Sequence, residues 1–324
     1  MSIIIKKFKS KSNCMNKISG VYCAAITPIN QDFSINKDLY LRHCQSLMRK
    51  GLDGLVLFGT NGEASSFSFK EKIESIQFLA DNKIDPKIMI TGTGSSSLRE
   101  AIELNKFSEN IGVKASLLLP PFYFKNVTDD GVLDYYRRVI EETGNNEFKF
   151  LLYNIPQHSG VTINFNIIET LLKLYPNNVV GLKDSTGNLD NMLKTIKYFN
   201  DFSVFCGNGA LALHTSKRGG AGAITGDANI TAKLLSFIIH NFKDEKSIQN
   251  FANLQSLLEN IRNVLASHEQ VSLLKAYYSV ADNIPEWNKL MPPLVNIENP
   301  SKNKQVIALL DLVGQIDTLV PSSS

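Results

Sequence analysis

The chain has 324 residues, of which 43% are hydrophobic and 20% charged, a composition that supports a large core and excludes wholesale disorder. Residues 1–19 hold five lysines and no acidic residue, while the whole chain has a formal net charge of only +3. The remainder is therefore close to neutral, and we expect no nucleic-acid partner. No run of about 18 apolar residues is present, so we also expect no membrane-spanning segment.

The N-terminal segment and the cysteines bear on cellular location. Residues 1–19 contain too few consecutive apolar residues for a secretory signal, and we expect a basic, disordered tail ahead of the fold. Cys14, Cys23, Cys44 and Cys206 are scattered, without a C-x-x-C pair or a histidine cluster. We therefore expect neither a disulfide framework nor a metal site, and the reducing cytoplasm is the predicted location.

From residue 20 onward, short apolar runs alternate with longer amphipathic stretches. The runs are rich in β-branched and aliphatic residues, as buried parallel strands are. The predicted strands are residues 21–27, 54–59, 87–91, 115–119, 149–153, 179–183, 203–206 and 222–225. Helical patterns follow them, and the clearest are residues 36–50, 69–80, 129–142, 163–174 and 189–199.

Eight alternations of strand and helix predict an α/β fold, a (β/α)8 TIM barrel over residues 20–230. A doubly wound sheet is the rival, but it would favour G-x-G-x-x-G after an early strand, where this chain has Thr27-Pro28. Residues 231–282 have helical patterns, and a last helix is predicted near residues 303–319. We expect residues 231–324 to form a C-terminal helical extension of the same domain.

The residues that follow each predicted strand are the candidate site residues, because barrel active sites lie at the C-terminal ends of the strands. The turn G-T-N-G-E at residues 59–63 follows the second strand. Its glycines permit a sharp turn that exposes backbone N–H groups toward a small anion, and Thr60 and Asn61 add polar side chains. This motif alone is weak, since any tight strand-to-helix turn has a similar composition.

Tyr153 and Lys183 end the fifth and sixth predicted strands. Burial disfavours the charged form of an amine, and a neutral amine is what a Schiff base requires. The structural alternatives are a tyrosine that packs in the core with its hydroxyl at the rim, and a lysine that extends to solvent or pairs with Asp184. These residues taken one at a time leave both alternatives open.

Glycine-rich segments at residues 207–209 and 219–225 end the last two predicted strands. Such loops bind phosphate in barrels, and they can equally hold a carboxylate through backbone N–H groups. Of the five histidines, His158 is the one that lies in a loop just beyond a strand end, and no pair has metal-ligand spacing.

Taken together, these segments resemble the dihydrodipicolinate synthase / N-acetylneuraminate lyase superfamily of class I, pyruvate-dependent aldolases. The resemblance covers about residues 20–320 and rests on the order and spacing of its motifs. Those motifs are G-V-Y at 20–22 through T-P at 27–28, G-T-N-G-E at 59–63, P-F-Y at 121–123, Y-N-I-P at 153–156 with S-G at 159–160, G-L-K-D at 181–184 and G-A-I-T at 222–225.

The resemblance implies that Lys183 forms a Schiff base with pyruvate or another 2-keto acid, with no separate cofactor. Tyr153, helped by Thr60, would act as general acid and base on the second substrate. Thr60, Asn61 and Ile224 would hold the carboxylate of the keto acid, largely through backbone groups.

The resemblance also implies an oligomer. Tyr123 matches a tyrosine that, in the synthases, reaches into the proton relay of the neighbouring subunit. A homodimer is therefore the smallest assembly expected, and a homotetramer is common in the family.

Three departures from the synthase pattern bear on the second substrate. Thr60-Asn61 stands where the synthases have Thr-Thr, and Phe122 replaces a tyrosine. His158 is the predicted substrate-binding residue at the place where the synthases have an arginine for the carboxylate of the aldehyde. A neutral histidine cannot match the bidentate fork of arginine. The N-acetylneuraminate lyases also lack that arginine, and K-D-S at 183–185 resembles the K-D-S/T of 2-keto-3-deoxy sugar-acid aldolases.

The predicted function is a Schiff-base lyase that reversibly cleaves a 2-keto-3-deoxy sugar acid to pyruvate and an aldehyde. One alternative is 4-hydroxy-tetrahydrodipicolinate synthase, which condenses pyruvate with aspartate semialdehyde. Another is a non-catalytic barrel that binds a sugar acid, although a binder need not keep Lys183, Tyr153 and Thr60 together. Related dehydratases tend to lose Y-N-x-P, which this chain retains.

Overall fold

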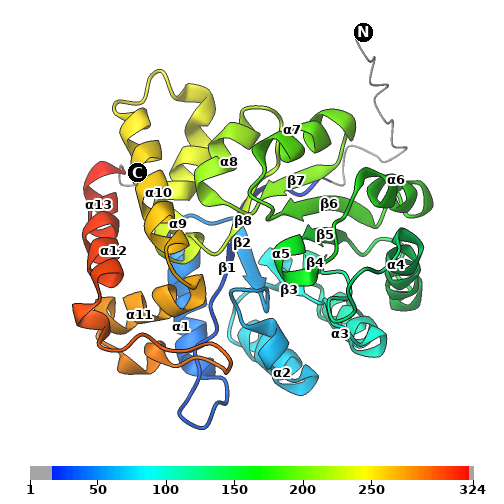
Figure 1. The fold of residues 1–324 in the computed structure, drawn as a ribbon, viewed down its shortest axis with the longest axis horizontal. Coiled ribbons are helices and arrows are strands. Elements are labelled where there is room, and N and C mark those ends of the chain that lie inside the picture. The colour runs from blue at the N-terminus through cyan, green and yellow to red at the C-terminus, as the bar shows by residue number, and fades with distance from the viewer. Residues whose placement is uncertain (1–16, 321–324) are drawn as a thin grey trace. The chain divides into compact units, whose positions relative to one another are not determined.

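A computed structural model describes residues 17–320 of the chain. Its eight strands form a closed barrel whose order follows the chain from β1 to β8 (Figure 1). The predicted (β/α)8 TIM barrel is therefore confirmed, and the doubly wound sheet is excluded. Most of the predicted N-terminal tail, residues 1–16, lies outside the described residues.

The strands are short and lie close to the predicted runs. They are β1 Gly20–Ala24, β2 Gly54–Leu57, β3 Met89–Gly92, β4 Ala115–Leu118, β5 Phe150–Asn154, β6 Val179–Asp184, β7 Ser203–Cys206 and β8 Gly222–Thr225. The first run was predicted to continue to Thr27, but β1 ends at Ala24. The N–H of Ile26 donates to the side chain of Asn229 at 3.1 Å, so this part of the run leaves the strand ladder.

Thirteen α-helices occur in residues 17–320. They are α1 Lys37–Arg49, α2 Phe69–Asp81, α3 Leu98–Ile111, α4 Asp129–Thr143, α5 Pro156–Ser159, α6 Phe165–Leu174, α7 Leu189–Tyr198, α8 Gly209–Ser216, α9 Ala228–Asn241, α10 Phe251–Ala266, α11 Gln270–Ala281, α12 Lys304–Gly314 and α13 Ile316–Leu319. Short 3-10 turns lie at Ala64–Ser66, Pro86–Ile88, Phe242–Asp244, Pro285–Asn288 and Pro300–Lys302. The last predicted helix is thus divided into α12 and α13.

Polar caps fix where several helices begin. Ser68 and Glu71 form a capping box ahead of α2, and the Asn188 side chain accepts from the Asn191 N–H at the start of α7. These bonds satisfy N–H groups that have no partner within the helix. At the other end, α3 stops at Gly112, whose φ of 82° is the left-handed conformation that glycine adopts readily.

The described chain comprises two compact units. The first holds residues 17–19 and 89–223, in which β3 to β7 pair in parallel, each with the next, and β7 pairs with the start of β8. The second holds residues 20–88 and 224–320, with β1 paired in parallel to β2 and the helices from α9 to α13. Residues 17–19 are attached to the first unit, because the Ile18 N–H donates to Ser203 Oγ at 3.1 Å.

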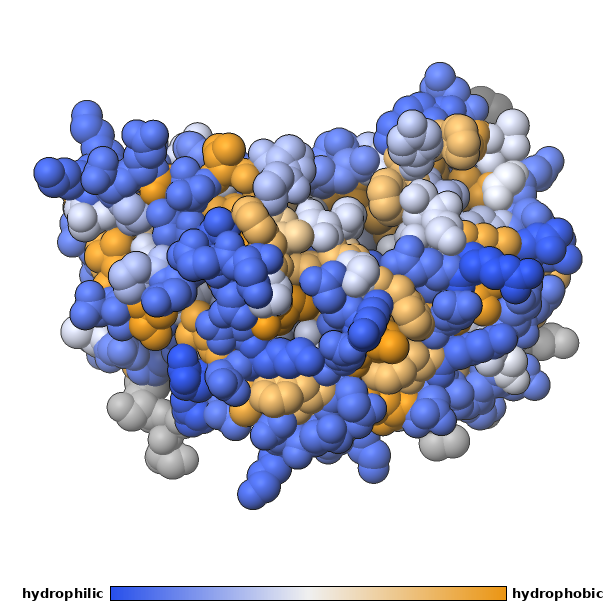
Figure 2. All heavy atoms as spheres, turned by 90° about the horizontal axis from the view of Figure 1, so that it is seen from below, coloured by the Kyte–Doolittle hydropathy of each residue, from blue (hydrophilic) through white to orange (hydrophobic). Residues whose placement is uncertain are grey.

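The surface is mainly polar where Figure 2 displays it, with hydrophobic side chains in small groups among hydrophilic ones. Large exposed hydrophobic residues include Tyr123 and Phe124 on the loop after β4. Within residues 17–320, no helix combines the length and the hydrophobicity that crossing a membrane requires.

Candidate active site

Neighbouring strands of the first unit bring Tyr153 and Lys183 together. The two residues are register partners on β5 and β6, and Lys183 Nζ donates a hydrogen bond to Tyr153 Oη at 3.1 Å. The same Nζ lies 4.2 Å from the centroid of the tyrosine ring. Lys183 is only 2% exposed and Tyr153 4% exposed. The alternative of a lysine that extends to solvent is therefore wrong, and an amine and a phenol share a buried environment.

Asp184 follows Lys183 but is held by other groups. Successive side chains of a strand point to opposite faces, and Asp184 Oδ1 accepts from the Thr186 N–H at 2.9 Å and the Thr186 hydroxyl at 2.6 Å. Its Oδ2 accepts from the side chains of Asn191 at 3.1 Å and Asn154 at 3.4 Å. The predicted alternative of a Lys183–Asp184 pair is thus not the arrangement found, and Asp184 instead anchors the end of β6.

Asn154 connects the lysine strand to the loop after β5. Its Nδ2 donates to Asp184, and its Oδ1 accepts from the Ile163 N–H at 3.1 Å. A side chain at Gly181 would collide with the Ser203 carbonyl of β7 and with Leu151 of β5. A glycine two residues before Lys183 therefore lets the three strands approach closely.

The loops after β4 and β5 carry the other two candidates of this unit. Tyr123 is 74% exposed, and its ring packs edge-on against Phe124 with centroids 5.3 Å apart. His158 is exposed on the short helix α5. Lys125 joins the two loops, because its Nζ donates to the Phe122 carbonyl and to the Ser159 carbonyl.

The second unit holds the G-T-N-G-E turn. Thr60 is exposed and Asn61 is half-buried, while the Thr27 hydroxyl donates to the Gly62 carbonyl at 2.9 Å. Glu63 is buried in the left-handed region at φ 54° and forms an ion pair with Lys275 of α11. Glu63 therefore anchors the turn through a buried ion pair. Thr60 and Asn61, at the start of the turn, stay at least partly exposed.

Gly226, two residues after Ile224, lies next to Asn61. Ile224 is fully buried in β8, and a side chain at Gly226 would collide with the Asn61 amide. The predicted carboxylate-binding residue Asn61 is therefore in contact with the backbone just after β8, the strand that holds the other predicted residue, Ile224. A glycine at 226 is required for this approach.

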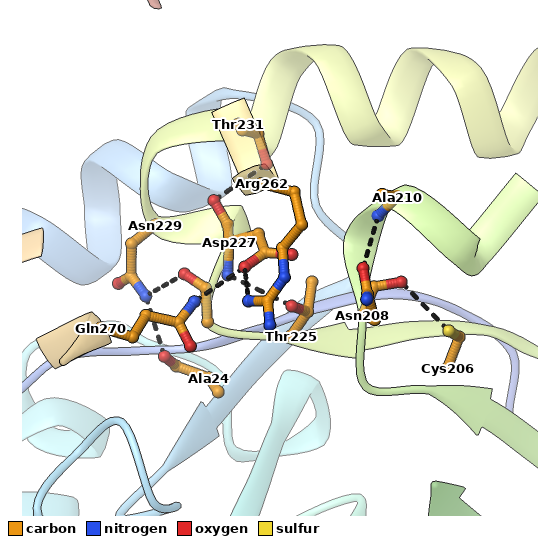
Figure 3. Close-up of polar contacts among 11 residues, drawn as sticks. Ala24, Cys206, Asn208, Ala210, Thr225, Asp227, Asn229, Thr231, Arg262 and Gln270 are labelled. Carbon is orange, nitrogen blue, oxygen red and sulfur yellow. Dashed lines mark hydrogen bonds and ion pairs between the residues drawn. The ribbon is translucent and has the colours of Figure 1, made fainter. Parts of the chain in front are cut away.

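A polar network that the sequence analysis did not find surrounds the turn after β8 (Figure 3). Asp227 Oδ1 accepts from Arg262 Nη1 at 2.9 Å and from Gln270 Nε2 at 2.7 Å. Asn229 Nδ2 donates to the carbonyls of Gly226 and Ala24 at 2.8 and 2.9 Å. The partners lie far apart along the chain, so residue spacing gave no signal for this network.

Within residues 17–320, no group of three or more His, Cys, Asp or Glu side chains could hold a metal ion. The thiols of Cys23, Cys44 and Cys206 are buried, and none of them forms a disulfide within the described residues. Cys14 lies outside the described residues.

Comparison with known proteins places this geometry in a family. The model of the dihydrodipicolinate synthetase family matches residues 17–311. A DapA-like lyase of uncharacterised function from Chloroflexus aurantiacus is 29% identical over 90% of this chain and 94% of its own length. A 4-hydroxy-tetrahydrodipicolinate synthase from Pelagibacter ubique is 31% identical over 88% of this chain and 95% of its own.

A solved structure agrees with these sequence matches. The dihydrodipicolinate synthase of Agrobacterium tumefaciens aligns with a TM-score of 0.81 and 26% identity, over 93% of this chain and 99% of that one. The chain belongs to the dihydrodipicolinate synthetase family, and it is a carbon–carbon lyase of the aldolase type. The resemblance noted from the motifs is thereby confirmed.

Proposed function

We propose that the protein uses Lys183 as a Schiff-base nucleophile to cleave a 2-keto-3-deoxy sugar acid reversibly into pyruvate and an aldehyde. The observation that supports this most strongly is the buried hydrogen bond of 3.1 Å between Lys183 Nζ and Tyr153 Oη. An amine beside a phenol in a desolvated site supplies both a nucleophile and a proton carrier.

The proposed reaction begins when the neutral Lys183 nitrogen adds to the C2 carbonyl. The Tyr153 phenol then gives its proton to the departing hydroxyl, so that water leaves and a protonated imine and the Tyr153 phenolate remain. The proton of the C4 hydroxyl then passes to the Tyr153 oxygen as the C3–C4 bond breaks. The electron pair of that bond moves into the imine, so an enamine forms and the aldehyde departs. A proton returns to C3, and water hydrolyses the resulting imine to free pyruvate and Lys183.

The family motif assigns the carboxylate site of this proposal to the G-T-N-G-E turn and to Ile224. Backbone N–H groups of a glycine-containing turn can bind a small anion, and residues 60–61 lie against the Gly226 backbone. We assign Thr60, Asn61 and Ile224 to the keto-acid carboxylate, and Thr60 to assistance of the Tyr153 relay. The family motif supports these roles. No metal or separate cofactor is needed, because the imine itself accepts the electrons.

His158 is the residue on which the choice of aldehyde rests. It is exposed on α5, in a loop that Lys125 joins to the loop after β4. Arginine binds a carboxylate strongly through its charged, bidentate fork. A neutral imidazole lacks that fork and is better suited to a hydroxyl partner. We therefore favour a polyhydroxylated substrate.

The second candidate is 4-hydroxy-tetrahydrodipicolinate synthase. Several relatives carry this name, including one that is 31% identical to this chain. The same amine and phenol would serve in a condensation of pyruvate with aspartate semialdehyde. The non-catalytic alternative is set aside, since the chain belongs to a family of enzymes.

The proposed partners are small molecules and further copies of the chain. We propose a cytoplasmic homo-oligomer, at least a dimer, in which the exposed Tyr123 and its neighbour Phe124 are covered by another subunit. Their exposed fractions of 74% and 75% in the single chain support a contact there.

A substrate comparison tests the proposal. Purified protein is given either 2-keto-3-deoxygluconate or pyruvate with aspartate semialdehyde, and pyruvate release or semialdehyde consumption is followed. Release from the sugar acid supports the lyase, while consumption of the semialdehyde with no release supports the synthase. A Lys183→Ala variant that retained either activity would contradict the shared mechanism.

A further inference from the structure

Asp227 is a buried carboxylate that the Schiff-base chemistry does not use. It lies two residues after β8, and its side chain is fully buried. Its Oδ1 accepts from Arg262 of α10 at 2.9 Å and from Gln270 of α11 at 2.7 Å, as Figure 3 shows. A buried charge is costly unless it is paired and hydrogen-bonded, and here both conditions are met.

Asp227 stands where a helix-capping side chain is expected, yet its side chain pairs with Arg262 and Gln270. It is the N-cap residue of α9, where an aspartate commonly accepts from N–H groups of the first helical turn. Its side chain makes no such capping bond and turns to α10 and α11 instead. Its N–H donates to the Thr225 hydroxyl at 3.2 Å, and its carbonyl accepts from the Thr231 hydroxyl at 2.9 Å.

The turn that Asp227 ends is the one that contacts Asn61. Asn229 fixes the Gly226 carbonyl at 2.8 Å, and the Gly226 backbone lies directly against the Asn61 amide. Residues 224–226 have little freedom between these contacts and Asp227. A shift of Asp227 would therefore move both Gly226 and Ile224.

The charge balance of the turn also supports a positioning role for Asp227. The proposed substrate is an anion, so an uncompensated carboxylate in the turn that helps to bind it would be unfavourable. Arg262 pairs with Asp227 and has a side-chain exposure of only 26%. The pair thus holds the turn in place without an unpaired negative charge in it.

We propose that Asp227, held by Arg262 and Gln270, is a positioning residue that sets the affinity of the carboxylate site for the keto acid. Helices α10 and α11 would tune substrate binding through this contact. The inference rests on the proposed function, because it assumes that Thr60, Asn61 and Ile224 bind the carboxylate.

The test uses the full chain and pyruvate as the probe. The adduct is trapped with borohydride across a range of pyruvate concentrations, and intact mass gives the concentration for half-maximal trapping. For Asp227→Asn we expect that concentration to rise about tenfold, with the maximal extent of trapping unchanged, because positioning acts on binding geometry. The Arg262→Met variant should shift in the same direction.

Two further variants separate positioning from a general loss of stability. Arg262→Lys keeps a cationic donor and should return half-maximal trapping to within about twofold of the wild type. Asp317→Asn is the matched control, since it breaks a 2.8 Å ion pair to Lys233 in the same unit but lies away from the turn after β8 in sequence. It should leave trapping unchanged. If Asp227→Asn does not fold, the positioning role is tested by comparing Arg262→Met with Arg262→Lys, because position 262 is partly exposed.

Each outcome bears on a different claim. Unchanged half-maximal trapping in Asp227→Asn and Arg262→Met, in protein that traps pyruvate normally, overturns the positioning role alone. Tighter trapping in Asp227→Asn also overturns it, since simple removal of a negative charge would produce that result. No adduct in the wild type overturns the proposed function and the positioning role with it.

Discussion

At the scale of single residues, the proposed chemistry depends mainly on Lys183 and Tyr153. Their positions made them candidates, because each ends a predicted strand and neighbouring parallel strands end at the same edge, but their roles were predicted from the family resemblance of the combined motifs. The sequence left open where the lysine side chain would point. The structure resolves that point with one buried hydrogen bond, which no spacing rule contains.

Replacing Tyr153 with phenylalanine tests the role of the phenol. The ring remains, but the oxygen that accepts from Lys183 and would carry the C4 proton is removed. We expect kcat to fall about 10²- to 10⁴-fold, while borohydride trapping of pyruvate on Lys183 persists. Steady-state kinetics and intact mass on the same preparation measure both effects. Full turnover by Tyr153→Phe would contradict the assignment.

His43 illustrates a buried residue whose charge affects stability. Its Nε2 lies 3.0 Å from Asn229 Oδ1, and its ring packs edge-on against Tyr278 and Trp287. Burial lowers the pKa of His43 to about 4. His43 is thus a packed core residue of α1 rather than a surface one.

The pH dependence follows from this lowered pKa. In the unfolded chain His43 binds a proton near pH 6.5. Between pH 6.5 and 4 the unfolded state therefore binds more protons than the folded state. Stability consequently falls as the pH falls through that window. We expect His43 to account for about 2 kcal/mol of lost stability between pH 7 and pH 4.5. Urea unfolding at both pH values measures it, and His43→Gln, which keeps a donor for Asn229, should lose less on acidification. An equal loss in both proteins would exclude His43 as the cause.

At the scale of elements, α11 holds the G-T-N-G-E turn through one buried ion pair. Lys275 and Glu63 are both almost completely buried, and Glu63 also accepts from the Met291 N–H at 2.8 Å. Burial lowers the pKa of Lys275, and the charge of Glu63 opposes that shift. The pair therefore depends on both partners.

Lys275→Met should leave Glu63 as an unpaired buried charge. We expect the free energy of unfolding to fall by about 3–5 kcal/mol, measured by urea denaturation. The double variant Glu63→Gln with Lys275→Met removes both charges and should recover part of the loss. If the double variant were no more stable than Lys275→Met alone, the ion pair would not be the source of the effect.

The sequence predicted the elements better than the contacts between them. Apolar runs and capping residues are local signals, so the strands fall close to their predicted places, apart from ends such as residues 25–27 of the first run. Glu63 and Lys275 are 212 residues apart, and His43 and Asn229 are 186 apart. Nothing local marks such partners, because each looks like an ordinary surface residue of a turn or helix.

At the scale of the whole molecule, the exposed pair Tyr123 and Phe124 supports an assembly larger than the 36.0 kDa chain. The double variant Tyr123→Glu with Phe124→Glu would add two charges to the proposed contact, and burying them there is costly. We expect light scattering to find a larger particle for the wild type and the monomer for this variant. Leu174→Glu, at another exposed apolar position with 52% exposure, is the control. A monomeric wild type would contradict the proposed assembly.

The Schiff base at Lys183 is the claim from which the rest follows. Incubation with pyruvate, reduction with borohydride and peptide mapping by mass spectrometry tests it directly. We expect one reduced adduct, on the peptide that contains Lys183, and none in a Lys183→Arg variant. An adduct on a different lysine, or no adduct in folded wild-type protein, would contradict the mechanism.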